Sequence, residues 1–313
     1  MKRLFAFAAT CTLVCATSVA ADIHGAWTAE VQDGSSMHMN LTTRGGHSNF
    51  GETMAKADFA GLTDAAMRAA TQTPVTFQLP REAGNMAFEG TFKDGFGAGQ
   101  FTFTPNQNYI ASLRSLGVTF EDSDRDDQQL MTMAMLDVST AFIRSMQAEG
   151  YRVSAEKYLS MRIFHVTPEL VRELRSLGYD KIDADDLVAT RIHKVTPDYI
   201  RAMRAAGYPN LSLENLVASR IHQATPEFLS EMKSLGYANI DFDDLIAFRI
   251  HRVTPDFVRE LRTLGYDNVS ADDLVTMRIH GVTTQFIREL KDAGYEHIPV
   301  EKLIDMRIHG IDA

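Results

Sequence analysis

Two rows of side chains that could do chemistry recur at intervals of 28 or 29 residues along the second part of the chain. The first row consists of the histidines His165, His193, His222, His251, His280 and His309. Imidazoles bind metals and titrate near neutral pH, so such a row could hold a metal or sense pH. Successive helical units pack on the order of 10 Å apart, however, which is too far for two imidazoles to share one metal through bonds of ~2 Å. We therefore predict a structural row, in which each histidine binds the last carbonyl groups of its helix.

The second row consists of the arginines Arg162, Arg191, Arg220, Arg249, Arg278 and Arg307. Guanidinium groups bind carboxylates and phosphates well, which would make this row an anion-binding stripe. Acidic pairs stand at the expected helix starts, at residues 185–186, 243–244 and 272–273. Ion pairing with these acids is the simpler interpretation, so we predict a structural role for this row as well.

A third group of arginines falls on the first helix expected in each repeat. Its members are Arg172, Arg201, Arg204, Arg259, Arg262 and Arg288. The alternative to a partner-binding role is a solvated face, in which these side chains cover apolar surface with their aliphatic stems. Among the residues of the chain, these arginines are our candidates for contacts with a protein partner.

Metal and catalytic motifs are weak. Asp122, Asp124 and Asp126 have the spacing of a calcium loop, but Asp127 stands where glycine is expected and Met133 where glutamate is expected. The Met37–Met39 segment contains thioether and imidazole ligands for copper, yet alternate residues of one strand point to opposite faces. The chain has no H-E-x-x-H motif and no nucleophile elbow. We predict no metal, no cofactor and no catalytic residue.

The interval between successive members of each row is that of an internal repeat. Five marker glycines, spaced by 29 residues, are Gly178, Gly207, Gly236, Gly265 and Gly294. Looser copies around Gly150 and Gly117 bring the total to about seven units. A fixed period of this length is typical of a solenoid, in which stacked units bury a core that none could bury alone.

Each unit has the sequence signals of two short helices. In the unit that begins at Val253, Thr254 is an N-cap and Pro255 takes the first helical position. Gly265 then ends the first helix, and Ser270 caps the second. The apolar contacts of the second helix are predicted to come from Leu274, Val275, Met277 and Ile279.

Residues 22–107 have a period of two instead, which is typical of strands with one buried face. Asp94-Gly95 predicts a hairpin turn, and residues 57–70 could hold one short helix. We expect five or six strands in a sandwich or open barrel. The predicted fold class is therefore α+β, with a small antiparallel β-domain at 22–107 followed by an α/α helical-hairpin array at 108–313.

The beginning of the chain has the layout of a secretory signal peptide over residues 1–21. Lys2-Arg3 precede an apolar run at 4–14, and small residues follow at 18–21. Both cysteines, Cys11 and Cys15, lie in this segment, so no disulfide or thiolate nucleophile is expected after it. A lipoprotein cysteine at Cys15 is the alternative, but Val14 precedes it where a small residue is expected. We expect export to the periplasm or the exterior of a bacterial cell.

The composition limits the class of partner. Hydrophobic residues make up 45% and charged residues 23% of the 313 residues, as in a globular protein. The formal net charge is −10, and no later run is long enough for a transmembrane helix. An acidic chain of this kind is a poor candidate for binding nucleic acid or an anionic membrane surface.

The repeat resembles a known pattern. Segments such as TPDFVRELRTLGY (residues 254–266) and VSADDLVTMRIHGV (269–282) are similar to tandem helical repeats of uncharacterised exported bacterial proteins. Similar arrays are appended to membrane metallopeptidases of the β-lactam-sensor antirepressor type. The resemblance covers most of residues 75–313 and implies a sensor or protein-interaction appendage. Since the chain lacks the metallopeptidase motif, the resemblance does not imply peptidase activity.

These observations predict an exported, non-enzymatic interaction or sensor module. It would bind a protein or cell-envelope component through the surface of the helical array. Two alternatives stay open. One is a hydrolase or metal-dependent enzyme at the β/α junction, which would need His24, His38 or His47 in a pocket beside carboxylates. The other is a regulatory partner of an antirepressor-type peptidase.

Overall fold

The structure is a computed structural model that describes residues 22–311, except 33, 45–48 and 121–125. The expected signal peptide, His47, Asp122 and Asp124 lie outside the described residues. The chain divides into two compact units, residues 1–162 and 163–313. Secondary structure changes from strand to helix near residue 107, as expected, but the first unit contains the sheet together with the first repeats.

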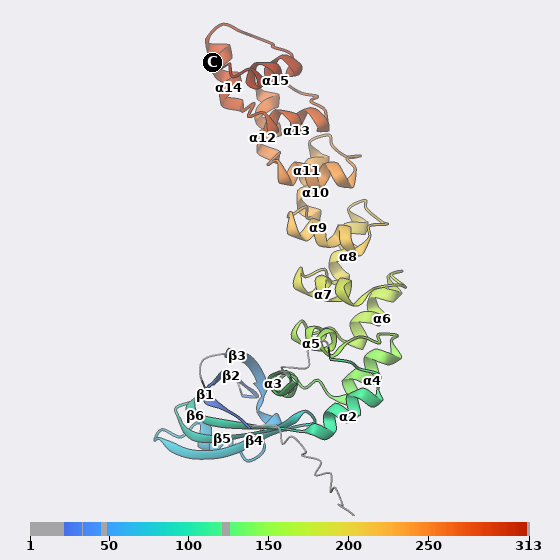
Figure 1. Ribbon diagram of the computed structural model, residues 1–313. Coiled ribbons are helices and arrows are strands. Elements are labelled where there is room, and N and C mark those ends of the chain that lie inside the picture. Colours follow the sequence, from blue (N-terminus) through green and yellow to red (C-terminus); the bar gives the residue numbers. More distant parts are fainter. Residues whose placement is uncertain (1–21, 33, 45–48, 121–125, 312–313) are drawn as a thin grey trace, which may run out of the picture. The chain divides into compact units, whose positions relative to one another are not determined.

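Six strands form one antiparallel sheet in the order β3-β2-β1-β6-β5-β4 (Figure 1). The strands are β1 (Ile23–Val31), β2 (Ser36–Thr43), β3 (Asn49–Ala55), β4 (Thr73–Arg81), β5 (Gly84–Lys93) and β6 (Phe96–Pro105). Asp94 and Gly95 form the predicted hairpin turn between β5 and β6, with φ angles of 49° and 86°. The antiparallel β-domain is thus confirmed, as a single sheet rather than a sandwich.

Aromatic residues fill the apolar face of this sheet. The rings of Phe77 and Phe88 stack with centroids 4.7 Å apart, and Trp27 meets Phe77 edge to face at 5.3 Å. Two short pieces, η1 (Lys56–Asp58) and α1 (Asp64–Met67), replace the single helix expected at 57–70. Phe59, between them, contacts both phenylalanine rings. These segments, together with α3 (Asp126–Met135) against β5 and β6, take the place of a second sheet.

Fourteen α-helices follow the sheet within the described residues, which makes seven pairs. The first helices of the pairs are α2 (Gln107–Ser115), α4 (Thr140–Ala148), α6 (Pro168–Ser176), α8 (Pro197–Ala205), α10 (Pro226–Ser234), α12 (Pro255–Thr263) and α14 (Thr284–Asp292). The second helices are α3, α5 (Ala155–Ile163), α7 (Ala184–Ile192), α9 (Leu213–Ile221), α11 (Phe242–Ile250), α13 (Ala271–Ile279) and α15 (Val300–Ile308). The α+β class with a helical array is confirmed.

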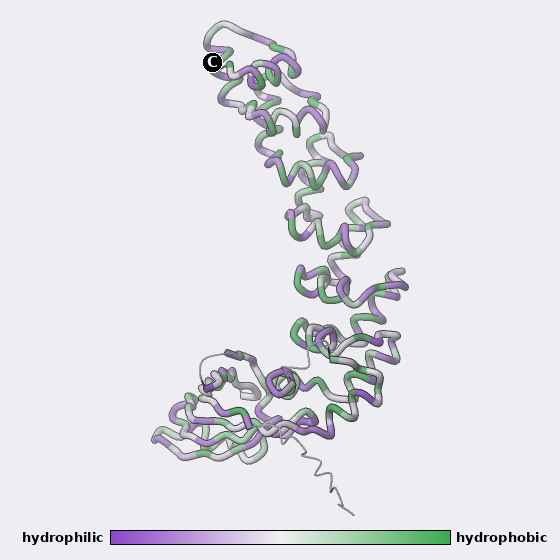
Figure 2. Tube along the Cα trace, in the orientation of Figure 1, coloured by the Kyte–Doolittle hydropathy of each residue, from purple (hydrophilic) through white to green (hydrophobic). Residues whose placement is uncertain are grey.

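The helix boundaries follow the predicted caps. The Thr254 hydroxyl accepts a hydrogen bond from the Phe257 amide at 3.2 Å, and Pro255 begins α12. Gly265 follows that helix with φ of 94°, in the left-handed region that glycine adopts readily. Hydrophobic and hydrophilic residues are interspersed along the helices of the array (Figure 2).

Within residues 163–313, like helices pack on like helices. Second helix contacts second helix in α7–α9, α11–α13 and α13–α15, and first helix contacts first helix in α12–α14. Leu245, Leu274 and Met277 are fully buried in the core that results. Helices of nine residues are too short to be stable alone, so this stacking provides their stability. Among the residues described, no helix has the length and apolar character needed to cross a membrane.

Candidate functional site

The arginines at the ends of α5, α7, α9, α11 and α13 bind the repeat before them. The Nε atoms of Arg191, Arg220, Arg249 and Arg278 donate hydrogen bonds to the carbonyl oxygens of Phe164, Lys194, His222 and His251, at 3.0, 3.1, 3.1 and 3.3 Å. These oxygens lie just past the C-terminus of the preceding second helix, where a positive charge also suits the helix dipole. In the first unit, Arg162 makes the same kind of bond to Leu136 at 2.7 Å.

The same guanidinium groups lie over aromatic rings of the first helices. The Cζ atoms of Arg220, Arg249, Arg278 and Arg307 lie 3.7, 4.7, 5.0 and 5.0 Å from the ring centroids of Tyr199, Phe228, Phe257 and Phe286. The contacts found for this row are therefore mainly with carbonyl oxygens and aromatic rings. Pairing with the acids at 185–186, 243–244 and 272–273 was the expectation, and these contacts replace it. The row joins successive repeats.

The histidine row lies beside these junctions. His193, His222, His251, His280 and His309 each follow a second helix directly as its C-cap residue. Nδ1 of His309 lies 2.8 Å from the Asp305 carbonyl oxygen, which is the type of contact that was predicted. His165 does not belong to this row, because it has φ of 53° and occupies the position of Lys194 in the next repeat. Phe164 stands at the histidine position instead.

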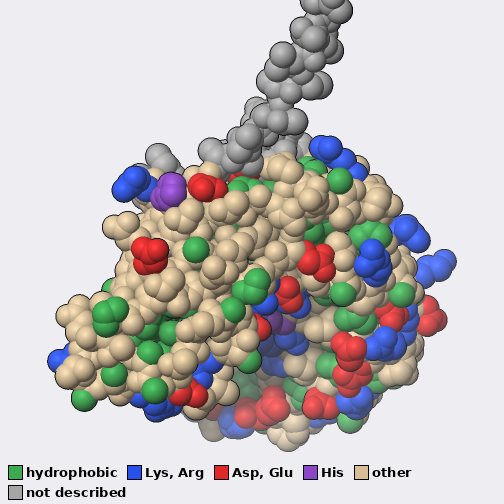
Figure 3. Space-filling view, turned by 90° about the horizontal axis from the view of Figure 1, so that it is seen from below, with side chains coloured by type: hydrophobic (Ala, Val, Ile, Leu, Met, Phe, Trp, Pro, Cys, Tyr) green, Lys and Arg blue, Asp and Glu red, His purple; other side chains and the backbone are tan. Residues whose placement is uncertain are grey.

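The first-helix arginines are held by groups of the array itself. Arg201 pairs with Asp198 at 2.7 Å and with Glu173 of the preceding repeat at 3.3 Å. Arg204 and Arg262 instead donate to the carbonyl oxygens of Leu177 and Leu235. The remaining pairs are Arg172 with Glu169, Arg259 with Asp256 and Glu231, and Arg288 with Glu260. The view from below likewise shows acidic and basic side chains interspersed over the visible face (Figure 3).

A row of tyrosines, which the sequence did not single out, joins the repeats in the other direction. The hydroxyl groups of Tyr179, Tyr208, Tyr237 and Tyr266 donate to the carbonyl oxygens of Leu211, Ile240, Val269 and Ile298 in the next repeat, at 2.8, 2.8, 2.7 and 2.8 Å. Burial raises the pKa of these phenols where a shift is resolved, to about 12 for Tyr208. The available signal was the tyrosine that follows each marker glycine.

Isoleucines form a second row that the sequence did not single out, and this row faces solvent. Its members, the isoleucine row, are Ile192, Ile221, Ile250, Ile279 and Ile308, which are 47% to 54% exposed. The expectation that Ile279 contributes apolar contacts to the core is wrong, because its 54% exposure places it on the outside of α13. The neighbouring arginine explains this: it takes the junction position, and the next residue is turned about 100° away on a helix of 3.6 residues per turn.

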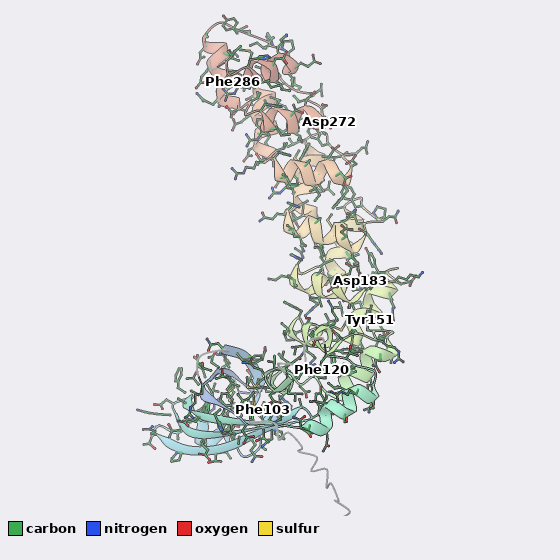
Figure 4. The ribbon with its side chains drawn as sticks, in the orientation of Figure 1. Phe103, Phe120, Tyr151, Asp183, Asp272 and Phe286 are labelled. Atoms are coloured by element: carbon green, nitrogen blue, oxygen red, sulfur yellow. The ribbon has the colours of Figure 1, made fainter. Side chains whose placement is uncertain are left out.

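An acidic residue lies seven positions before each of these isoleucines. This acidic row consists of Asp185, Glu214, Asp243, Asp272 and Glu301, all of which are exposed. Seven residues are nearly two helical turns, so both rows share the outward face of the second helices, which we name the second-helix surface. Asp183 and Asp272 mark the ends at which α7 and α13 begin (Figure 4).

The carboxylates of adjacent repeats influence one another. The pKa of Asp244 is raised, first by burial and then by the charges of Asp241, of Asp272 in the next repeat, and of Asp243. The pKa of Asp186 is raised in the same way, first by burial and then by the charges of Asp183, of Glu214 in the next repeat, and of Asp185. Negative potential therefore accumulates along the beginnings of the second helices.

The alternative of a hydrolase or metal-dependent enzyme would need convergent titratable groups at the β/α junction, and several charged and polar side chains there make structural contacts. Arg81 pairs with Asp58 at 2.8 Å, and Glu82 accepts a hydrogen bond from the Thr140 amide at 2.9 Å. The Tyr109 hydroxyl, whose pKa burial raises, donates to the Val138 carbonyl.

The polar face of the sheet carries a shallow depression. It is lined by His24, Ala26, Thr42, Arg44 and Gln100, and Glu89 lines an adjoining one. Nδ1 of His24 is 3.0 Å from the Thr102 hydroxyl. A candidate histidine and a carboxylate thus line neighbouring hollows on this face of the sheet.

No metal centre is found among the described residues, where three or more histidine, cysteine, aspartate or glutamate side chains do not converge anywhere. Met37 and Met39 are buried in the sheet core, whereas Nδ1 of His38 lies 3.1 Å from the Thr53 hydroxyl on the opposite face. One strand thus presents the three residues to two sides, as the alternation of strand residues requires.

No protein-family model matches this chain, and no curated protein was found to be similar to it.

Proposed function

We propose that this protein is an exported, non-enzymatic binding module whose second-helix surface contacts another protein of the cell envelope. The observation that carries this proposal is the isoleucine row, with five half-exposed aliphatic side chains at the same position of five successive repeats. Single exposed hydrophobic residues are common, but a row of them on one side of a stack marks an interaction surface.

The needs of the fold do not account for the isoleucine row. The junctions between repeats are made by the arginine and tyrosine rows, and the cores are filled by other residues, such as Leu274 and Met277. A polar residue at the exposed position would leave these contacts intact. Burying the exposed part of each isoleucine under a partner would contribute about 25 cal/mol per Å² of apolar area.

The first-helix surface is less suited to a partner. Four of its six candidate arginines pair with carboxylates of the array, as in Arg201 with Asp198 and Glu173, and Arg204 and Arg262 donate to carbonyl oxygens. A partner that recruited these arginines would have to replace existing contacts. We therefore propose the second-helix surface, and not the first-helix arginines, as the binding site.

The proposed location rests on the sequence of residues 1–21, which has the layout of a signal peptide. Export would place the array in the periplasm or outside the cell, where envelope proteins are available as partners. The acidic net charge of −10 favours a protein partner over nucleic acid or an anionic membrane.

Site-specific photo-crosslinking in intact cells tests this proposal. A photoreactive residue is introduced at Ala218 or Ala247 on the second-helix surface, and at Ala202 or Ser230 on first helices as controls. We expect one discrete protein adduct from the second-helix positions and none from the controls. The double substitution Ile221→Gln and Ile250→Gln should remove the adduct. Adducts that form equally from the control positions, or that persist in the double variant, would refute this binding surface.

A further inference from the structure

We propose that the segment bound on the second-helix surface is a cationic, apolar polypeptide, whose aliphatic side chains contact the isoleucine row and whose lysines or arginines lie over the acidic row. This inference rests on the proposed function and specifies the chemistry of its partner.

The two rows form parallel stripes with a low floor between them. The seven-residue separation along each second helix corresponds to ~10 Å at a rise of 1.5 Å per residue. Midway between the rows stand small, partly buried side chains, which are Ala189, Ala218, Ala247 and Thr276. A chain that lies across the helices can approach their backbones along this line, with one stripe on either side.

Three members of the acidic row, Glu214, Asp243 and Asp272, lack the ion pairs that neutralise the first-helix acids. Within the part of the chain that the structure describes, no lysine or arginine lies within ion-pair distance of Glu214, Asp243 or Asp272. By contrast, Glu231 and Asp256 on the first helices both pair with Arg259. Over these three successive repeats, the second-helix surface therefore has a negatively charged edge for which the described residues provide no ion-pair partner.

No row of bases balances the acids from the other side of the isoleucine row. The residue after each histidine is basic in two of the five repeats, as Lys194 and Arg252, and is Gln223, Gly281 or Gly310 in the others. The acidic position, however, is Asp or Glu in all five. A complementary partner therefore needs positive charges over the acidic row, but it does not need a row of negative charges on the other side of the isoleucine row.

This charge pattern excludes other occupants. A second copy that docked through the same surface would set one acidic row against the other. Anionic lipid would be repelled by the same row. A cationic segment instead gains Coulomb attraction while its apolar side chains cover the isoleucines, and such complementarity also rejects acidic competitors.

The repeat spacing suits an extended segment. Successive units lie on the order of 10 Å apart, and a polyproline II chain advances about 9 Å in one three-residue turn. A peptide built from Leu-Pro-Lys units would place one leucine and one lysine per repeat on the two rows. Its counterpart with Leu-Pro-Glu units has the same length and apolar content but the opposite charge.

Fluorescence anisotropy with these two labelled peptides and the chain 22–313 tests the inference. The lysine peptide should bind at least about tenfold more tightly than the glutamate peptide, a difference of about 1.4 kcal/mol, and should weaken as salt screens the attraction. The triple variant Glu214→Gln, Asp243→Asn, Asp272→Asn should lose this preference. The matched control Asp198→Asn, Glu231→Gln, Asp256→Asn makes the same change in net charge on first helices and should retain it. Circular dichroism confirms that each variant is folded.

The outcomes separate this inference from the proposed function. Equal binding of the two peptides, or an equal loss in the first-helix control, would overturn the cationic partner. If the envelope adduct nevertheless forms and depends on the isoleucine row, the binding function stands with a partner of different charge. If the lysine peptide binds through both rows but no envelope adduct forms, the inference on peptide chemistry stands and the proposed function fails.

Discussion

The guanidinium carbon of Arg220 lies 3.7 Å from the centre of the Tyr199 ring, on the first helix of the same repeat. Its Nε also donates to the Lys194 carbonyl of the repeat before, at 3.1 Å. One side chain thus connects both helices of a repeat with the preceding one. The Tyr199 hydroxyl completes the group by lying 2.7 Å from the hydroxyl of Ser219, which is buried. Such contacts between neighbours determine the stability of a repeat array.

Removing this arginine should destabilise the array. Arg220→Ala loses a cation–π contact and a hydrogen bond to a carbonyl, and leaves that acceptor without its partner. We expect a loss of about 1–3 kcal/mol in the free energy of unfolding. Arg201→Ala removes only surface ion pairs, so its effect should stay below about 1 kcal/mol. Urea denaturation followed by circular dichroism compares the two, and an equal effect would mean that the Arg220 junction does not stabilise the stack.

The tyrosine row can be tested by deleting one oxygen atom. Tyr237→Phe removes the hydrogen bond to the Val269 carbonyl and should cost about 0.5–1.5 kcal/mol. Tyr295 stands at the same position of its repeat but is 64% exposed, so Tyr295→Phe serves as the control and should be neutral. Thermal unfolding of both variants measures the difference. If Tyr237→Phe unfolds at the temperature of the unchanged protein, the hydroxyl bond contributes nothing to the junction.

An exposed and a buried isoleucine should respond differently to the same substitution. Ile250 is 52% exposed, whereas Ile200 is fully buried in α8. Ile250→Gln should change the free energy of unfolding by no more than about 0.5 kcal/mol. Ile200→Gln places an amide in the core and should cost about 3 kcal/mol or more. A large loss of stability for Ile250→Gln would show that the isoleucine row belongs to the core rather than to a binding surface.

The contact between Glu260 and the next repeat should make stability depend on pH. Hydrogen bonds from Thr284 and Arg288 hold the pKa of Glu260 below its ordinary value. Its contribution is therefore present above the pKa of the unfolded chain, about 4.3, and is lost as the pH falls through the lowered folded value. Glu260→Gln should lower the melting temperature at pH 7 and have little effect near pH 3. The same decrease at both pH values would contradict this electrostatic origin.

The residue after each histidine offers a stabilising substitution. Arg252 has φ of 58°, whereas glycine takes the equivalent position at Gly281 with φ of 72°. A side chain in this left-handed region costs roughly 1 kcal/mol. Glycine removes this cost, but it also makes the unfolded chain more flexible, which offsets part of the gain in stability. Arg252→Gly should thus be neutral or stabilising by up to about 1 kcal/mol, and the reverse change Gly281→Arg should be destabilising. Paired melting curves check both signs.

Much of the architecture follows from local signals. Thr254 and Pro255 begin α12, and Gly265 ends it, because caps and left-handed positions depend on a few neighbouring residues. The hairpin at Asp94-Gly95 and the period of two in the strands are equally local. Repetition strengthened each of these signals, since the same prediction was made once per repeat.

The partners of the arginine rows could not be predicted in this way. Charge suggested that Arg249 would pair with nearby acids, but its contacts are with the His222 carbonyl, the Gln223 side chain and the Phe228 ring. Carbonyl oxygens exist at every residue, so sequence does not show which of them an arginine can reach. The stacking of one repeat on the next decides this, and it also places Arg262 on a carbonyl rather than at the surface.

The sequence by itself determined the repeat, the two-helix unit, the antiparallel β-domain and the order in which they occur. Caps, turns and hydrophobic periods are encoded over a few residues, which is why they could be read without a structure. The tertiary structure alone decided that Ile279 faces solvent while its neighbour Arg278 is drawn into the junction. Both residues are compatible with either side of a nine-residue helix, and only the packing of neighbouring repeats fixes which side is buried. The candidate surface could therefore be identified only after the repeats were stacked.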